Sequence, residues 1–113
     1  MTNITLSELQ KIIGEWVKKN NFGWSNYAAY CHLVEEVGEL GESITVASGE
    51  RKAGSGSQAL ADHTNVSEEL GDVLFSLIDI SNRYNIDLNK CFKNTIVRYN
   101  QKVTMLASMK GNK

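Results

Sequence analysis

Two short stretches of the sequence carry a repeated set of acidic residues. Residues 35–40 read EEVGEL and residues 68–73 read EELGDV, so two acids, an apolar residue, a glycine, an acid and an apolar residue recur with an offset of 33 positions. The match extends to Ser43 and Ser76, each four residues beyond the last acid of its copy. Chance rarely produces such a match, so we treat the two copies as parts of one site.

The chemistry that such acids can do depends on what neutralises them. Carboxylates that are brought together and partly removed from water repel each other, and they are tolerated only if they take up protons or hold a cation. Oxygen ligands suit a hard divalent ion such as Mg²⁺, or Mn²⁺, which keeps several waters and is completed by substrate phosphates. The alternative is that the acids form the solvated faces of two helices. The duplication favours the metal site.

Both copies lie in segments with the apolar spacing of an amphipathic helix. The predicted apolar stripes are Leu33, Val37, Leu40 and Ile44 in the first copy, and Val66, Leu70, Val73 and Leu77 in the second. At about 100° per residue, Glu36 lies at the edge of its stripe and Glu39 lies roughly 60° further round. Glu69 and Asp72 occupy the same angles on their helix, so packing the two stripes together would gather all four carboxylates beside one core.

The whole chain is expected to be a single helical domain. Its 113 residues suffice for one core, its net charge is −1, and its hydrophobic content of 42% is ordinary for a globular protein. The absence of proline and of clean period-2 runs favours an all-α, four-helix bundle-like subunit. The near-neutral charge gives no global indication of a nucleic acid or membrane partner.

Capping residues set the expected helix limits. Thr5 with Glu8 forms a capping box for a first helix over about 6–19, and Ser25 or Asn26 caps a second helix that ends near residue 46. Asn65 caps a third helix that ends near residue 84. Asp87 caps a last helix over about 88–108, whose expected buried stripe is Leu88, Cys91, Phe92, Thr95, Ile96, Tyr99, Val103 and Leu106.

Two connections could contribute to a site. The turn before the second helix carries Phe22 and Trp24, which either fill the space under the turn or form a wall that stacks on a nucleobase. The segment 47–64 is rich in glycine and serine and is expected to be a mobile loop. Its Arg51 and Lys52 could meet phosphates, although a plain surface loop is the simpler interpretation.

The last helix carries a row of polar residues at four-residue spacing, namely Lys90, Asn94, Arg98 and Lys102. Solvated surface is the default interpretation of such a row, yet an acidic metal site for a polyanion needs cations nearby. Gly38 and Gly71 lie inside the expected helices, where each costs about 1 kcal/mol relative to alanine. We expect another helix, from this chain or from a second copy, to approach closely there.

The expected compartment is the cytoplasm. Cys31 and Cys91 fall on or near apolar positions of separate helices and are expected to be reduced core thiols. The first residues lack the charged and apolar regions of a signal peptide, and no apolar run approaches the length of a membrane span. A role for His32 as a metal ligand is disfavoured, because the Glu-x-x-His order of di-iron bundles is absent.

The paired acids resemble the signature of the MazG-type all-α nucleoside triphosphate pyrophosphohydrolases. The resemblance covers nearly the whole chain and includes the turn at 85–88 and the polar pattern of the last helix; the spacer between Glu39 and Glu69 lies at the long end for the family. The family comprises MazG proteins, dimeric dUTPases, dCTP pyrophosphatases and phosphoribosyl-ATP pyrophosphohydrolases. The long spacer bears on the lid and on substrate selectivity.

The resemblance implies Mg²⁺-dependent hydrolysis of a (deoxy)nucleoside triphosphate to the monophosphate and pyrophosphate, in house-cleaning of non-standard or surplus nucleotides, by a homodimer or homotetramer. It implies that the metal ligands are Glu36, Glu39, Glu69 and Asp72, with Glu35 and Glu68 as neighbours that orient or deprotonate water. Trp24, Lys90, Asn94 and Arg98 are the expected substrate-binding residues. The alternatives are a phosphoribosyl-ATP pyrophosphohydrolase-like enzyme and a non-catalytic, metal-binding helical interaction module.

Overall fold

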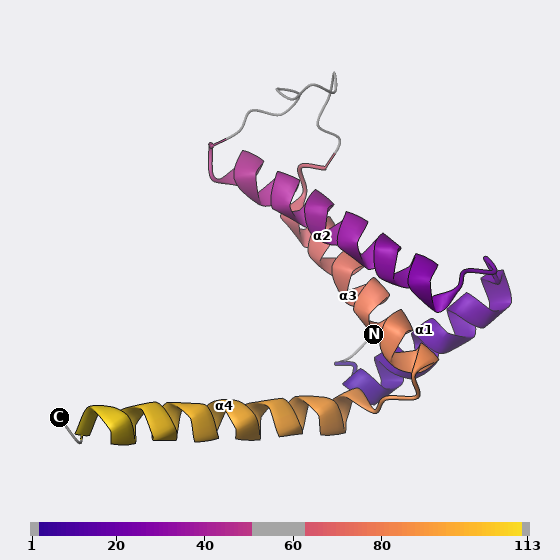
Figure 1. Cartoon of the computed structure of the whole chain (residues 1–113). Coiled ribbons are helices and arrows are strands. Elements are labelled where there is room, and N and C mark those ends of the chain that lie inside the picture. The colour runs from indigo at the N-terminus through magenta and orange to yellow at the C-terminus, as the bar shows by residue number, and fades with distance from the viewer. Residues whose placement is uncertain (1–2, 51–62, 112–113) are drawn as a thin grey trace.

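The computed structural model describes residues 3–50 and 63–111, which form four helices (Figure 1). These are α1 (Leu6–Asn20), α2 (Asn26–Ala47), α3 (Val66–Arg83) and α4 (Leu88–Gly111). The all-α prediction is confirmed, and the described part of the chain contains no strand. No described helix combines the length and the apolar character that crossing a bilayer requires. Most of the predicted loop at 47–64, including Arg51 and Lys52, lies outside the described residues.

The helix starts follow from side-chain caps. Thr5 Oγ1 accepts a hydrogen bond from the backbone N–H of Glu8 at 3.1 Å, and Ser25 Oγ accepts one from Ala28 at 3.1 Å. Asn65 Oδ1 does the same for Glu68 at 3.1 Å. Each cap satisfies a donor that the first helical turn leaves free, which is why the starts predicted from the sequence agree with the structure.

The helices α2 and α3 form the main packing unit, lying side by side in opposite directions (Figure 1). The two serines of the sequence repeat, Ser43 and Ser76, are buried in this unit. Small side chains at such positions let two helices approach closely. The Ser43 hydroxyl remains satisfied because it donates to the carbonyl of Leu40 at 2.7 Å.

The predicted contact between the two apolar stripes is only partly correct. Four residues of the stripes are about half exposed, namely Val37 and Ile44 of α2 and Leu70 and Leu77 of α3. By contrast, the side chain of Glu69 is only 5% exposed. The helices are therefore rotated so that the serines and an acid face inward. Part of each apolar stripe faces outward in the single chain.

A hydrogen-bond network around Gln10 fixes α1 against the end of α3 and the start of α4. Gln10 Nε2 donates to Ser81 Oγ at 3.0 Å and to the carbonyl of Ile86 at 2.7 Å, and Gln10 Oε1 accepts from the backbone N–H of Leu88 at 3.1 Å. The Asn82 side chain returns a bond to the Gln10 carbonyl at 2.8 Å. This network determines the direction in which α4 leaves the body.

The helix α4 extends away from the α2–α3 pair instead of packing into a bundle with it (Figure 1). It packs against α1 near its start, and it has no buried residue. The predicted buried stripe on this helix is therefore wrong for the single chain, and Cys91 is an exposed thiol while Cys31 is half-buried. The exposed large apolar side chains of α4 are Phe92, Ile96, Val97, Tyr99, Val103, Met105, Leu106 and Met109.

The interior glycines do not mark a close helix contact within the described chain. A Cβ atom added at Gly38 or at Gly71 would meet no atom of the described residues within 4 Å. The expected approach of another helix at these positions therefore finds no support within one chain. The expectation of an approach by a second copy stays a prediction.

Candidate active site

Four acids of the repeat gather between α2 and α3. Ligand atoms of Glu36, Glu69 and Asp72 all lie within 4.8 Å of one another, and those of Glu39, His63 and Glu69 form a second group with the same spacing. Glu69 belongs to both groups. The geometric expectation that the repeat brings its carboxylates together thus agrees with the structure, although the helices are rotated from the predicted packing.

Two buried carboxylate oxygens indicate that a cation fits this cluster. Glu36 Oε2 and Glu69 Oε2 are buried and have no hydrogen-bond partner in the described part of the chain. A buried anionic oxygen without a partner is costly. Burial raises the pKa of Glu36, and the hydrogen bond and charge of Glu39 raise it further, against the opposing charge of His32. A divalent ion among these oxygens would relieve both the desolvation and the repulsion.

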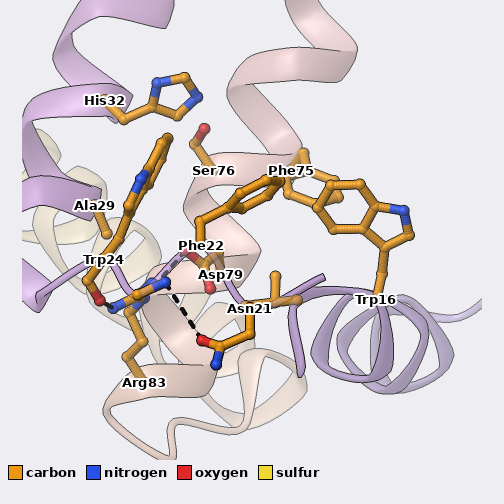
Figure 2. Close-up of a pocket in the computed structure, with 12 residues that line it drawn as sticks. Trp16, Asn21, Phe22, Trp24, Ala29, His32, Phe75, Ser76, Asp79 and Arg83 are labelled. Atoms are coloured by element: carbon orange, nitrogen blue, oxygen red, sulfur yellow. Dashed lines mark hydrogen bonds and ion pairs between the residues drawn. The ribbon is translucent and has the colours of Figure 1, made fainter. Parts of the chain in front are cut away.

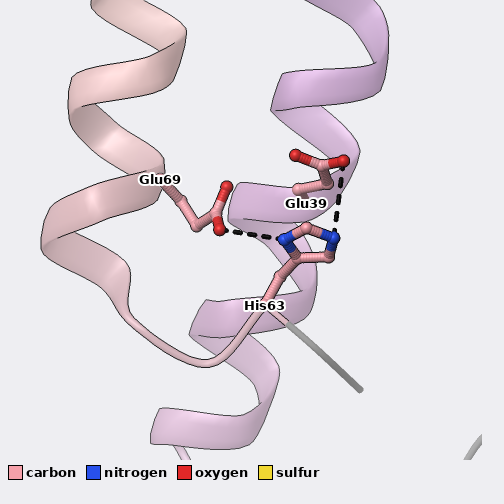
Figure 3. Close-up of side chains that lie close together, drawn as sticks. All are labelled: Glu39, His63 and Glu69. Carbon is pink, nitrogen blue, oxygen red and sulfur yellow. Dashed lines mark hydrogen bonds and ion pairs between the residues drawn. The ribbon is translucent and has the colours of Figure 1, made fainter. Parts of the chain in front are cut away.

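His63 joins the cluster from the segment just before α3 (Figure 3). Its Nδ1 lies 3.0 Å from Glu69 Oε1 and its Nε2 lies 3.5 Å from Glu39 Oε1, so the ring stands between an acid of α2 and an acid of α3. The hydrogen bond to Glu69 raises the pKa of His63, and the charge of Glu39 adds to the effect. A proton on the ring is therefore favoured by the two carboxylates.

The two predicted neighbours of the metal ligands lie further out. The Glu35 side chain is 72% exposed and approaches His32 Nδ1 at 4.0 Å. Glu68 is exposed, and its backbone N–H is engaged with the Asn65 cap. Neither belongs to the two groups of potential ligands. A role for Glu35 in orienting water stays a prediction, for which its position at the solvent side is suitable.

An aromatic cavity of about 190 Å³ lies beside the acid cluster (Figure 2). Trp16, Phe22, Trp24 and Phe75 contribute rings to its lining. The rings of Phe22 and Trp24 lie 5.8 Å apart, and Phe22 also lies 5.7 Å from Trp16. Phe22 is 59% and Trp24 is 43% exposed, so neither ring is a fully buried plug under the turn. Their stacking on a nucleobase stays a prediction.

Polar groups of α3 line the other side of the cavity. Ser76 and Asp79 lie one turn apart on this helix, and Figure 2 shows the Ser76 hydroxyl beside the rings. Asp79 Oδ2 accepts from Arg83 Nε at 3.1 Å, and Arg83 also donates to the Trp24 carbonyl at 2.8 Å. Arg83 thereby ties the aromatic turn to α3.

His32 connects the cavity with the acid cluster. Its Nε2 lies 3.1 Å from Glu36 Oε1, and its ring packs edge-on against Trp24 with centroids 4.8 Å apart. One side chain thus contacts a potential metal ligand and a wall of the aromatic cavity. This contact places the acid cluster next to the cavity.

The three predicted substrate-binding residues of α4 do not reach this site within one chain. Lys90, Asn94 and Arg98 are exposed on α4, which points away from the α2–α3 pair (Figure 1). Arg98 donates to Thr95 Oγ1 of its own helix at 3.0 Å. If these residues bind substrate, they do so at the site of another copy.

Sequence reasoning missed several residues that the fold brings to the site. His63 lies two residues before the Asn65 cap and six before Glu69. A histidine can bind metal ions, so its nearness to the second acid set in the sequence was a usable signal. Asp79 and Arg83 are spaced as an i, i+4 ion pair, and Asp79 follows Asp72 by two helical turns. The sequence therefore showed the spacing of Asp79 and Arg83. It did not show that Arg83 also contacts the aromatic turn.

Comparison with known proteins gives consistent matches. Residues 25–104 match the family described as the MazG nucleotide pyrophosphohydrolase domain. The uncharacterized protein YpjD of Bacillus subtilis (strain 168) is 28% identical over 101 residues, which cover 88% of this chain and 87% of that protein. A crystal structure of YPJD from Bacillus subtilis matches with a TM-score of 0.73 at 25% identity, over 88% of this chain and 97% of that chain.

A second solved structure supports the same relationship. It is the crystal structure of the Bacillus-conserved MazG protein, described as a nucleotide pyrophosphohydrolase. The match has a TM-score of 0.69 at 29% identity and covers 88% of this chain and 93% of that chain. The match thus extends beyond the acid-bearing helices to most of both chains.

Proposed function

Because this chain belongs to the MazG nucleotide pyrophosphohydrolase domain family, a family of hydrolases, we propose that it converts a (deoxy)nucleoside triphosphate to the monophosphate and pyrophosphate with Mg²⁺ as its cofactor. Mn²⁺ is an alternative ion. The cellular role that we propose is the removal of non-standard or surplus nucleotides.

The observation that carries this proposal is the position of the acid cluster next to the aromatic cavity. Glu36 and Glu69 each contribute a buried oxygen without a partner, and Trp24 forms a cavity wall that His32 joins to Glu36. A nucleotide has a flat base at one end and an anionic chain at the other. The two halves of the site match these two ends.

We assign the cation-holding role to Glu36, Glu39, Glu69 and Asp72. A divalent ion held there would neutralise the phosphates and stabilise charge on the leaving pyrophosphate. The carboxylates themselves would repel a triphosphate, so they select for a substrate that arrives with the ion. Glu35, on the solvent side of α2, is the residue that we propose to orient the attacking water.

We propose that the aromatic cavity takes the base. Its volume of about 190 Å³ is below the roughly 300–1,000 Å³ of pockets for drug-sized ligands, so it suits one ring system rather than a whole nucleotide. Trp24 would stack on the base. Asp79 can accept hydrogen bonds and Ser76 can accept or donate them, so the α3 side of the cavity would distinguish bases by their polar edges.

We propose a homodimer or homotetramer as the active form. Much of the apolar surface of α4 and of the outward stripes of α2 and α3 is exposed in the single chain. Contiguous apolar surface of this kind marks an interaction site. A second copy is the occupant we propose, because its α4 would also bring Lys90, Asn94 and Arg98 toward the acids.

The test is a panel of dNTPs and NTPs, with phosphoribosyl-ATP included, assayed with Mg²⁺ for release of pyrophosphate. Turnover of ordinary or modified nucleotides in preference to phosphoribosyl-ATP supports the proposal, and the reverse preference supports the alternative enzyme. Asp79→Asn, which replaces an acceptor by an amide, is expected to reorder the preference among bases. Absence of turnover on every substrate would favour the non-catalytic interaction module.

The bond that is cleaved is tested with ¹⁸O-labelled water. We propose attack at the α phosphorus, because four carboxylates can hold more than one divalent ion, or one ion bound to two phosphates, and these ions would neutralise a pyrophosphate leaving group. The label is then expected in the nucleoside monophosphate, with unlabelled pyrophosphate. Label in pyrophosphate, or release of orthophosphate and a diphosphate, would contradict this direction of attack.

A further inference from the structure

The two groups of potential metal ligands differ in one chemical respect. Glu36, Glu69 and Asp72 offer oxygen alone, whereas the group of Glu39, His63 and Glu69 adds an imidazole. Carboxylate oxygens suit Mg²⁺, while imidazole suits ions such as Zn²⁺, Fe²⁺ and Ni²⁺, and Mn²⁺ accepts both donor types. The nature of the ligands therefore distinguishes the two groups, even though they share Glu69.

From this difference we infer that His63 is a metal ligand, and that Glu39, His63 and Glu69 form a divalent-ion position that prefers Mn²⁺ and later transition ions to Mg²⁺. The inference rests on the proposed function only in the use of the same acids for a divalent ion. It assigns a nitrogen ligand to a site for which the sequence predicts oxygen ligands alone.

The geometry around the ring fits this role. His63 Nδ1 and Glu69 Oε1 are 3.0 Å apart, which is about the separation of two adjacent ligand atoms that each lie about 2.1 Å from one ion. A metal-binding histidine usually donates its other ring N–H to a carboxylate, which fixes the ring. The carboxylate oxygen beside the Nε2 atom of His63 is Glu39 Oε1, at 3.5 Å. Figure 3 shows the other oxygen of Glu39 on the side of Glu69, so one oxygen of Glu39 can orient the ring while the other binds the ion.

A second observation points to a cation beside Glu69, the acid that the two groups share. The Glu69 side chain is 5% exposed, yet its Oε2 has no partner within the described residues. His63 satisfies only the other oxygen, Oε1. A cation is the missing partner that an unpaired, buried carboxylate oxygen requires. The His63 ring is 36% exposed, so an ion can approach from solvent.

The other histidine of the chain provides a matched control. His32 has the same side-chain exposure as His63 and also lies next to a carboxylate, with Nε2 at 3.1 Å from Glu36. It differs because its ring packs on Trp24 and it belongs to neither group of potential ligands. Replacing each histidine in turn therefore separates metal ligation from mere proximity to an acid.

The test uses the full chain with Mn²⁺ as the probe and no nucleotide. Electron spin-echo modulation of bound Mn²⁺ is expected to show a ¹⁴N coupling in the unaltered protein and in His32→Asn, and to lose it in His63→Asn. Isothermal titration is expected to show at least about a tenfold weaker Mn²⁺ affinity for His63→Asn, with Mg²⁺ affinity changed by much less. Circular dichroism confirms that both variants fold.

Other outcomes overturn the inference. A ¹⁴N coupling that survives in His63→Asn, or that disappears only in His32→Asn, would show that His63 is not the ligand. Equal losses of Mn²⁺ and Mg²⁺ affinity would assign His63 a charge-balancing role only. Mg²⁺-supported hydrolysis is measured separately, so failure of the proposed function with a retained ¹⁴N coupling, or the reverse, can be told apart.

Discussion

At the scale of single residues, the main feature of the site is a group of carboxylates that lie close together and are partly removed from water, so they repel each other. Glu36 combines a buried oxygen without a partner, a raised pKa and the nearby charges of Glu39 and Asp72. Such a group opposes folding of the metal-free protein, whereas in the proposed function it would bind an ion. Stability and function therefore make opposite demands on the same side chain.

Removal of one anionic ligand is expected to separate these two effects. Glu36→Gln or Asp72→Asn keeps nearly the same volume but loses several kcal/mol of transition-state stabilisation, so kcat/KM should fall about a thousandfold or more. The melting temperature of the metal-free protein should rise by a few degrees because repulsion is relieved. Calorimetry in chelator and a pyrophosphate assay measure the two effects. Full activity of the unaltered protein in excess chelator would contradict the role of the ion.

The raised pKa of His63 predicts a pH dependence of the stability in the metal-free state. Its folded-state pKa is raised above the ordinary value of 6.5, so the folded protein holds the proton more tightly than the unfolded chain does. This stabilisation is complete below pH 6.5 and is lost as the pH rises through the raised pKa. Denaturant titrations from pH 6 to 8 in chelator, which span about this range, should show falling stability, and His63→Gln should flatten the slope. Rising stability would contradict the assignment.

Trp24 is expected to contribute binding that is equal in the ground state and the transition state. Trp24→Ala should raise KM by about tenfold or more, given the 1–3 kcal/mol typical of base stacking, and should change kcat much less. Steady-state kinetics measures both constants. An unchanged KM together with a large fall in melting temperature would show that the ring only supports the turn.

The acid repeat and the segment before α3 differ in how far the sequence constrains their side chains. The repeat allowed the gathering of Glu36, Glu39, Glu69 and Asp72 to be predicted, because a fixed offset and helical spacing constrain where side chains project. The position of His63 could not be predicted in the same way. It lies in the segment before α3, where no periodicity links a residue to its neighbours in space.

At the scale of elements, helix starts were predictable and helix partners were not. Thr5, Ser25 and Asn65 cap their helices through local bonds that a sequence reports directly. The apolar stripe of α4 was also recognisable, but the described chain fully buries none of its residues. Periodicity shows that a face avoids water, and it carries no information on whether the same chain or another one covers that face.

The exposed face of α4 predicts a position-specific effect on assembly. Phe92→Asp should weaken self-association by more than about tenfold, since burying a phenylalanine contributes about 1.5–3 kcal/mol. Thr104→Asp is the control, because residue 104 lies about 120° round the helix from Phe92. Its neighbours one turn away, at positions 100, 101, 107 and 108, are polar or small. Light scattering after size-exclusion chromatography measures both. Equal effects of the two variants would show that this face is not the interface.

At the scale of the whole molecule, a single copy is too extended for its length. Its radius of gyration is 18.5 Å, against about 13 Å for a compact domain of this size. The buried apolar core among the described residues consists of Ile13, Ala29 and Ile78. A core this small cannot offset the conformational entropy of the chain, so folding and association are expected to be coupled.

Because α4 projects away from the acids of its own chain, two inactive variants are expected to restore activity when they form mixed dimers. In the proposed oligomer, one copy supplies Glu36 and another supplies Arg98 to each site. Glu36→Gln and Arg98→Ala chains, each inactive alone, should then complement each other when they are co-expressed. Random pairing into dimers would restore about a quarter of the unaltered activity, because half of the dimers are mixed and each has one intact site. A mixture no more active than its parents would mean that each copy works with its own residues.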